Sequence, residues 1–95
     1  MAVDGTWVLR LDTPGAGRLV ELVLAADGES LTGTFDGEPI ANGQTDGANV
    51  VFSAEVISPV KLKVKCFGFI DGDTMNGTAR ATMMKVAFVG ERKPS

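Results

Sequence analysis

Apolar and polar residues alternate along most of the chain in short runs that recur about every 12 residues, as in small all-β proteins. The clearest run is Val60 to Lys65, in which valine and leucine alternate with three lysines. Successive side chains of a strand point to opposite faces, so this run predicts a strand with one buried face and the lysines in water. No run keeps a 3.6-residue apolar period long enough to predict a helix. We therefore expect an all-β fold.

The runs are bounded by glycine, aspartate, asparagine and proline, and they predict eight strands in a single domain, residues 1–95. The fourth strand has two possible registers: Ile40, Asn42 and Gln44 point inward in one, and a slip by one residue replaces them by their neighbours. Both registers stay open. We place the strands at Thr6–Thr13, Arg18–Ala25, Leu31–Asp36, Glu38–Thr45, Asn49–Val56, Val60–Phe69, Thr74–Arg80 and Met83–Arg92.

A weak internal repeat supports this division. The segment Asp27–Thr34 matches Asp71–Thr78 in character at each position, and a degenerate third copy begins at Asp46. Each copy predicts a tight Asp-Gly turn of type I′, then an inward apolar residue, then a strand glycine at which the sheet bends.

We expect the eight strands to close into a barrel, and the turns predict that its two ends differ. If the strands form an antiparallel up-and-down meander, the Asp-Gly turns share one end with Trp7, and we expect the barrel to be closed there. The opposite end, here called the proline end, carries Pro14, Pro39 and Pro59. An eight-stranded barrel is just wide enough to fill itself or to hold one small ligand, so a filled core and an apolar pocket at the proline end both stay open. The candidate ligand-binding residues are Leu11, Phe35, Ile40, Asn42, Phe52, Ala54, Leu62, Ala79 and Met84.

The predicted outer face is also apolar in places. Phe67 and Phe69 are expected to point outward, and strands eight, one and two are neighbours in a closed meander. A contiguous apolar exterior is typical of a partner surface, which favours a homo-oligomer, most simply a two-fold dimer. Its expected surface is Val8, Leu19, Val23, Met83, Ala87 and Val89.

Composition narrows the chemistry. The net charge of -3 and the lack of a clustered basic face argue against nucleic-acid binding. No apolar run reaches the roughly 18–20 residues of a membrane span, and no basic, apolar leader precedes the first strand, so we expect a cytoplasmic protein. Without histidine or tyrosine, the usual acid–base and nucleophile–base pairs are missing, and the inward-facing Cys66 alone cannot build a zinc site. We expect no cofactor and no metal.

Two motifs resemble known families. Gly5-Thr6-Trp7 together with the closing Phe88-Val89-Gly90-Glu91-Arg92 resembles the pattern of calycins, which include lipocalins, fatty-acid-binding proteins and avidins. That resemblance implies that Arg92 lies across the indole of Trp7 in a cation–π contact. The Asp-Gly repeat is similar to that of small bacterial β-barrel domains of unassigned function.

Three functions are compatible with these patterns. The leading hypothesis is a binding module for an apolar small molecule. The second is a structural or interaction domain with a filled core, which works through its outer face. The third and least favoured is a cofactor-free isomerase or cyclase that encloses an apolar substrate, so a non-enzymatic role is preferred.

Overall fold

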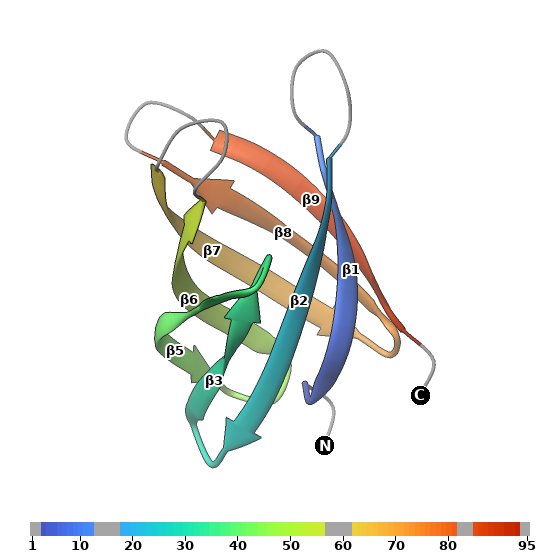
Figure 1. Ribbon diagram of the computed structural model, residues 1–95. Coiled ribbons are helices and arrows are strands. Elements are labelled where there is room, and N and C mark those ends of the chain that lie inside the picture. Colours follow the sequence, from blue (N-terminus) through green and yellow to red (C-terminus); the bar gives the residue numbers. More distant parts are fainter. Residues whose placement is uncertain (1–2, 13–17, 57–61, 82–84, 94–95) are drawn as a thin grey trace.

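The chain folds into a single twisted antiparallel sheet that closes on itself (Figure 1). A computed structural model describes residues 3–12, 18–56, 62–81 and 85–93. No helix among them is long and apolar enough to cross a membrane. The strands are β1 (Gly5–Leu11), β2 (Arg18–Asp27), β3 (Ser30–Phe35), β4 (Glu38–Pro39), β5 (Ala41–Thr45), β6 (Asn49–Val56), β7 (Leu62–Asp71), β8 (Thr74–Arg80) and β9 (Lys85–Arg92).

Each strand pairs with its neighbours in the chain, and β9 closes the barrel against β1 through pairs from Trp7↔Arg92 to Leu11↔Phe88. Strands β4 and β5 are successive parts of one strand position, because both pair with β3 and β5 continues the sheet to β6. The predicted eight-stranded up-and-down meander barrel is therefore confirmed. Strands β1, β6 and β8 end at the proline end, uppermost in Figure 1, where β2, β7 and β9 begin.

The core is built from the inward-facing residues of the strands, which alternate with outward-facing residues along each strand. Trp7, Leu9 and Leu22 are fully buried, as are Phe35 and Phe52, whose ring centroids lie 6.2 Å apart at an interplanar angle of 51°. Burying a side chain of this size contributes about 1.5–3 kcal/mol. Large buried side chains thus hold the core of the barrel.

The repeated glycines have a steric reason. A Cβ on Gly33 would lie 1.7 Å from the carbonyl oxygen of Val23, and one on Gly77 would lie 2.1 Å from that of Phe67. Real side chains do not approach so closely, so these glycines let neighbouring strands cross at short range, as expected for glycine within strands.

The expected turn type was wrong. The hairpins are closed by the pairs Asp27↔Ser30 and Asp71↔Thr74, so the central residues are Gly28 and Gly72 with the residue that follows each. Only the two glycines have positive φ, 63° and 64°. Glycine at the first central position is typical of a type II′ turn rather than type I′.

The fourth predicted strand follows neither register throughout. The pairing with β6 shifts between Ala41 and Gln44, and Asn42 within this bulge has a φ of 54°. Ile40 is half-buried against the core as in the first register, whereas Thr45 points inward as in the second and is 8% exposed. An inward Asn42 was therefore wrong: the bulge leaves both Asn42 and Gln44 exposed.

The sixth predicted strand is longer than expected. It forms β7, which includes Phe67 and Phe69 as predicted and continues two residues further to Asp71. Phe67 and Phe69 point outward, as predicted, with 37% and 50% of their surface exposed.

Candidate functional site

The wall of the barrel is lower on one side of the proline end. Strand β3 pairs with β2 only as far as Leu22↔Phe35, and β5 pairs with β6 only as far as Ala41↔Ser53. The stretch of β6 beyond Ser53 is therefore paired on one side only among the described residues. This sets back the rim and brings inner residues of β6 near the surface.

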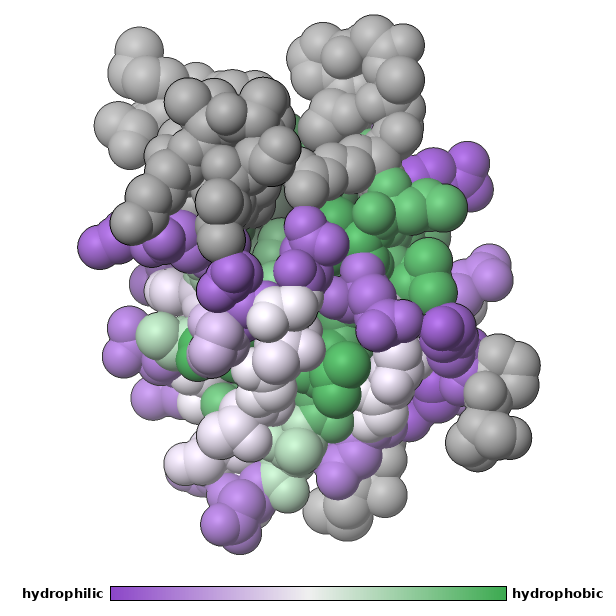
Figure 2. Space-filling view, in the orientation of Figure 1, coloured by the Kyte–Doolittle hydropathy of each residue, from purple (hydrophilic) through white to green (hydrophobic). Residues whose placement is uncertain are grey.

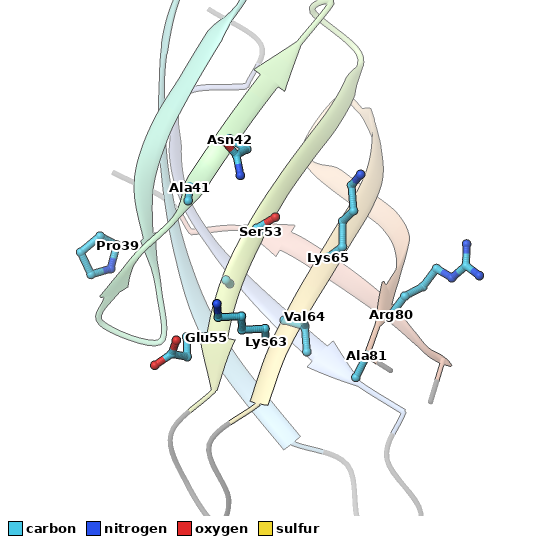
Figure 3. Close-up of a pocket in the computed structure, with 11 residues that line it drawn as sticks. Pro39, Ala41, Asn42, Ser53, Glu55, Lys63, Val64, Lys65, Arg80 and Ala81 are labelled. Atoms are coloured by element: carbon cyan, nitrogen blue, oxygen red, sulfur yellow. The ribbon is translucent and has the colours of Figure 1, made fainter. Parts of the chain in front are cut away.

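A hollow of about 420 Å³, here called the rim hollow, lies at this set-back rim (Figure 3). It spans β4 and β5 on one side, β6 and β7 in the middle, and the end of β8 on the other. Its lining comes from both faces of the sheet, because at the rim the inward and outward side chains border the same space.

The inner part of the rim hollow is apolar. Ala54 is 6% exposed and pairs across the strands with the half-buried Val64. Ala79 is 7% exposed and faces Val86, which is also half-buried. Alanine therefore occupies two inward positions on β6 and β8, of which Ala54 lines the rim hollow.

The outer part of the rim hollow is positively charged. Lys63, Lys65 and Arg80 line it and are exposed, against the single carboxylate of Glu55. In Figure 3 Lys65 and Arg80 extend from β7 and β8, and Ser53 lies on β6 between them and Asn42. Three cations against one anion give this rim a preference for an anionic group.

The structure brings only part of the predicted ligand set together. Asn42 and Ala54 line the rim hollow; Ile40, between β4 and β5, and Ala79, on β8, are each next in sequence to residues that line it. Phe35 and Phe52 are 1% and 0% exposed and belong to the core below. Met84 and the side chain of Leu62 lie outside the described residues.

Leu11 lies elsewhere on the rim. It borders a separate hollow of about 330 Å³ between β1 and β9, together with Phe88. Sequence reasoning missed the cations Lys63, Lys65 and Arg80, because an alternating lysine run was interpreted as a solvated face. Their place in the lining of the rim hollow depends on the set-back of β4 and β5, for which the hydrophobic pattern carries no signal.

At the other end, Trp7 is enclosed. Its ring is fully buried, and its Nε1 donates a hydrogen bond to the carbonyl oxygen of Val3 at 3.2 Å. The guanidinium carbon of Arg92 lies 4.4 Å from the ring centroid, which is the cation–π contact implied by the calycin resemblance. Trp7 therefore has no exposed surface for a ligand.

Two other candidate groups are structural. Burial raises the pKa of the Cys66 thiol to about 12, so it stays protonated and inert at neutral pH. Hydrogen bonds from the Asn49 side chain and from the backbone amides of Asn49 and Ala48 hold the pKa of Asp46 at about 2. Within the described ranges, no three histidine, cysteine, aspartate or glutamate residues are placed to hold a metal ion.

The predicted oligomer surface is only partly continuous. Leu19, Val23 and Val89 are 67%, 36% and 52% exposed, and Ala87 is also exposed, whereas Val8 is half-buried and Met83 lies outside the described residues. Between Leu19 and Val23 stands Glu21, whose carboxylate lies 3.1 Å from Nζ of Lys93. Figure 2 shows hydrophilic residues lying between hydrophobic ones on the face of the barrel that it displays.

Comparison with protein-family models, with curated proteins and with solved structures finds no match to this chain. The calycin resemblance therefore extends to a compatible architecture, a closed antiparallel barrel with an arginine over a buried tryptophan.

Proposed function

We propose that this protein is a small-molecule binding module that takes an amphipathic compound, apolar in its body and anionic at one end, in the rim hollow. The observation that carries this proposal is a hollow of about 420 Å³ whose inner wall is apolar and whose outer rim is cationic. Ligand sites are typically about 300–1,000 Å³, mostly apolar, with a few polar groups that fix orientation.

The apolar body would lie against Ala54 and Val64. Each methylene removed from water contributes about 0.8 kcal/mol. Ordering the ligand and the rim offsets a large part of this, so we expect micromolar rather than nanomolar affinity.

The anionic end would face Lys63, Lys65 and Arg80. Exposed ion pairs each contribute only about 0–1 kcal/mol, so these cations choose among ligands and set their orientation more than they add affinity. Asn42 and Ser53 supply further polar groups on the opposite side of the hollow.

Native mass spectrometry of freshly purified protein would reveal a co-purified ligand. Calorimetric titration with decanoate, decan-1-ol and decyltrimethylammonium then tests the two halves of the proposal, and we expect affinity to fall in that order. Ala54→Leu should weaken all three ligands by filling the apolar wall, whereas the control Ala25→Leu, on an exposed position of β2, should not.

Lys63→Gln should weaken decanoate about fivefold, the factor that corresponds to about 1 kcal/mol, and leave decan-1-ol unchanged. Equal affinity for the three compounds would contradict the anionic end. Unchanged binding in Ala54→Leu would place the ligand elsewhere.

A further inference from the structure

The outer face of β7, β8 and β9 is ordered in bands across the strands. The basic band is the row Lys65↔Arg80↔Lys85, and the acidic band is the row Asp71↔Thr74↔Glu91. Between them lie two uncharged rows, Phe67↔Thr78↔Ala87 and Phe69↔Asn76↔Val89. We call this surface the banded wall.

The uncharged rows are unusually apolar for an exposed surface. Phe67, Phe69 and Val89 are 37%, 50% and 52% exposed; the two phenylalanines are neighbours on β7, and Asn76 separates Phe69 from Val89. The three cations and two carboxylates of the flanking bands are exposed as well. Exposed apolar residues with a charged rim are typical of a protein–protein contact.

The two charged bands lie three residues on either side of the row Gly68↔Gly77↔Phe88 and carry opposite charges. A two-fold axis along this row, in the plane of the wall and across the strands, reverses the strand direction in the partner copy. Lys65 then faces Asp71, Lys85 faces Glu91, and Phe67 faces Phe69. Each favourable pair occurs twice, as in any isologous contact.

We propose that the banded wall is the docking surface for a second copy of this chain, which binds face to face with its strands antiparallel to those of the first. Charge complementarity identifies the partner as a second copy, since the wall carries both the cations and the carboxylates that would pair across the contact. The alternative two-fold axis, parallel to the strands, would place the basic bands against each other. This dimer is independent of ligand binding in the rim hollow.

The size of the wall sets the expected strength. The six residue steps from Lys65 to Asp71 span about 20 Å and two strand spacings span about 10 Å, so the wall covers about 200 Å², which is small beside the roughly 800 Å² per partner of a standard interface. We therefore expect a weak dimer, with a dissociation constant on the order of 100 µM.

Sedimentation equilibrium tests whether the dimer forms. Loading concentrations from about 10 µM to about 1 mM lie on both sides of the expected dissociation constant. Two charge-reversed variants carry the test: Lys65→Glu with Lys85→Glu, and Asp71→Lys with Glu91→Lys. Each alone should remain monomeric, because like charges then face each other. An equimolar mixture of the two should associate at least as strongly as the unmodified protein, and so should the variant with all four changes.

Phe69→Ala, at the centre of the wall, should weaken the dimer about tenfold or more. The matched control is Asp27→Lys with Glu29→Lys, which changes the net charge equally in the exposed turn between β2 and β3 and should leave association unchanged. Restoration in the mixture also shows that both reversed variants are folded.

Three results would overturn the proposal. A monomer at about 1 mM would remove the second copy, since that concentration is far above the expected constant. A dimer that both reversed variants keep would place the contact on another face, such as the one containing Leu19 and Val23. Reversed variants that stay monomeric when mixed would exclude the antiparallel arrangement.

Discussion

At the scale of single residues, Arg92 joins three parts of the barrel. Its guanidinium covers Trp7, its Nε lies 3.2 Å from Oδ1 of Asp73, and its Nη atoms donate hydrogen bonds to the carbonyl oxygens of Asp4 and Gly72. Strand β1, the turn between β7 and β8, and strand β9 thus meet at one side chain. Arg92 therefore stabilises the barrel both by its contact with the Trp7 ring and by its polar contacts with Asp4, Gly72 and Asp73.

Truncating this side chain should be costly. We expect Arg92→Ala to lower the free energy of unfolding by about 2–3 kcal/mol, through the lost cation–π contact and the hydrogen bonds from a charged donor. Urea denaturation monitored by Trp7 fluorescence measures it. The control Lys93→Ala removes only the exposed pair with Glu21, for which we expect at most about 1 kcal/mol. Equal losses in the two variants would show that Arg92 is an ordinary surface cation.

At the scale of elements, the bulge of β5 in its pairing with β6 shapes the rim hollow. It turns Asn42 out of the barrel and into the lining of the rim hollow. Strand alternation placed the other strands correctly because each keeps its period of two, as β7 does from Lys63 to Asp71. A bulge breaks that period with a backbone change at one residue, so neither uniform register could describe this strand.

The bulge predicts a specific response to substitution at Asn42. Its φ of 54° lies in the left-handed region, which glycine and asparagine adopt readily and β-branched residues do not. We expect Asn42→Gly to be close to neutral and Asn42→Val to lower the free energy of unfolding by about 1–2 kcal/mol, measured by urea denaturation. Gln44→Val, on the same exposed side of β5, should be neutral or slightly stabilising. A harmless Asn42→Val would mean that the positive φ is not required.

At the scale of the whole molecule, the fold was predictable and the site was not. Closure into a meander followed from strand count, short turns and the buried Trp7, all of which are local patterns. The rim hollow depends on where β3 and β5 stop pairing, and the banded wall depends on the register of β7 with β8 and β9. Registers between strands are set by the packing of the finished barrel, so residues such as Lys65, Arg80 and Lys85 could not be aligned beforehand.

The same scale governs the dependence of stability on pH. The chain has no histidine, so no side chain has an ordinary pKa between about pH 5 and 8, and stability should be flat there. Folding lowers the pKa of Asp46 from 3.8 to about 2, so its contribution is present above pH 3.8 and is lost as the pH falls through about 2. Folding raises the pKa of Cys66 from 9.0 to about 12, so its contribution is present below pH 9.0 and is lost as the pH rises through about 12.

The midpoint of urea denaturation, measured from about pH 2 to about pH 11, should therefore show a plateau with two falling limbs. Asp46→Ala should flatten only the acid limb, and Cys66→Ala only the alkaline one, whose slope approaches about 1.4 kcal/mol per pH unit for one proton. Each variant serves as the control for the other limb. An alkaline limb that persists in Cys66→Ala would mean that the buried thiol does not couple folding to pH.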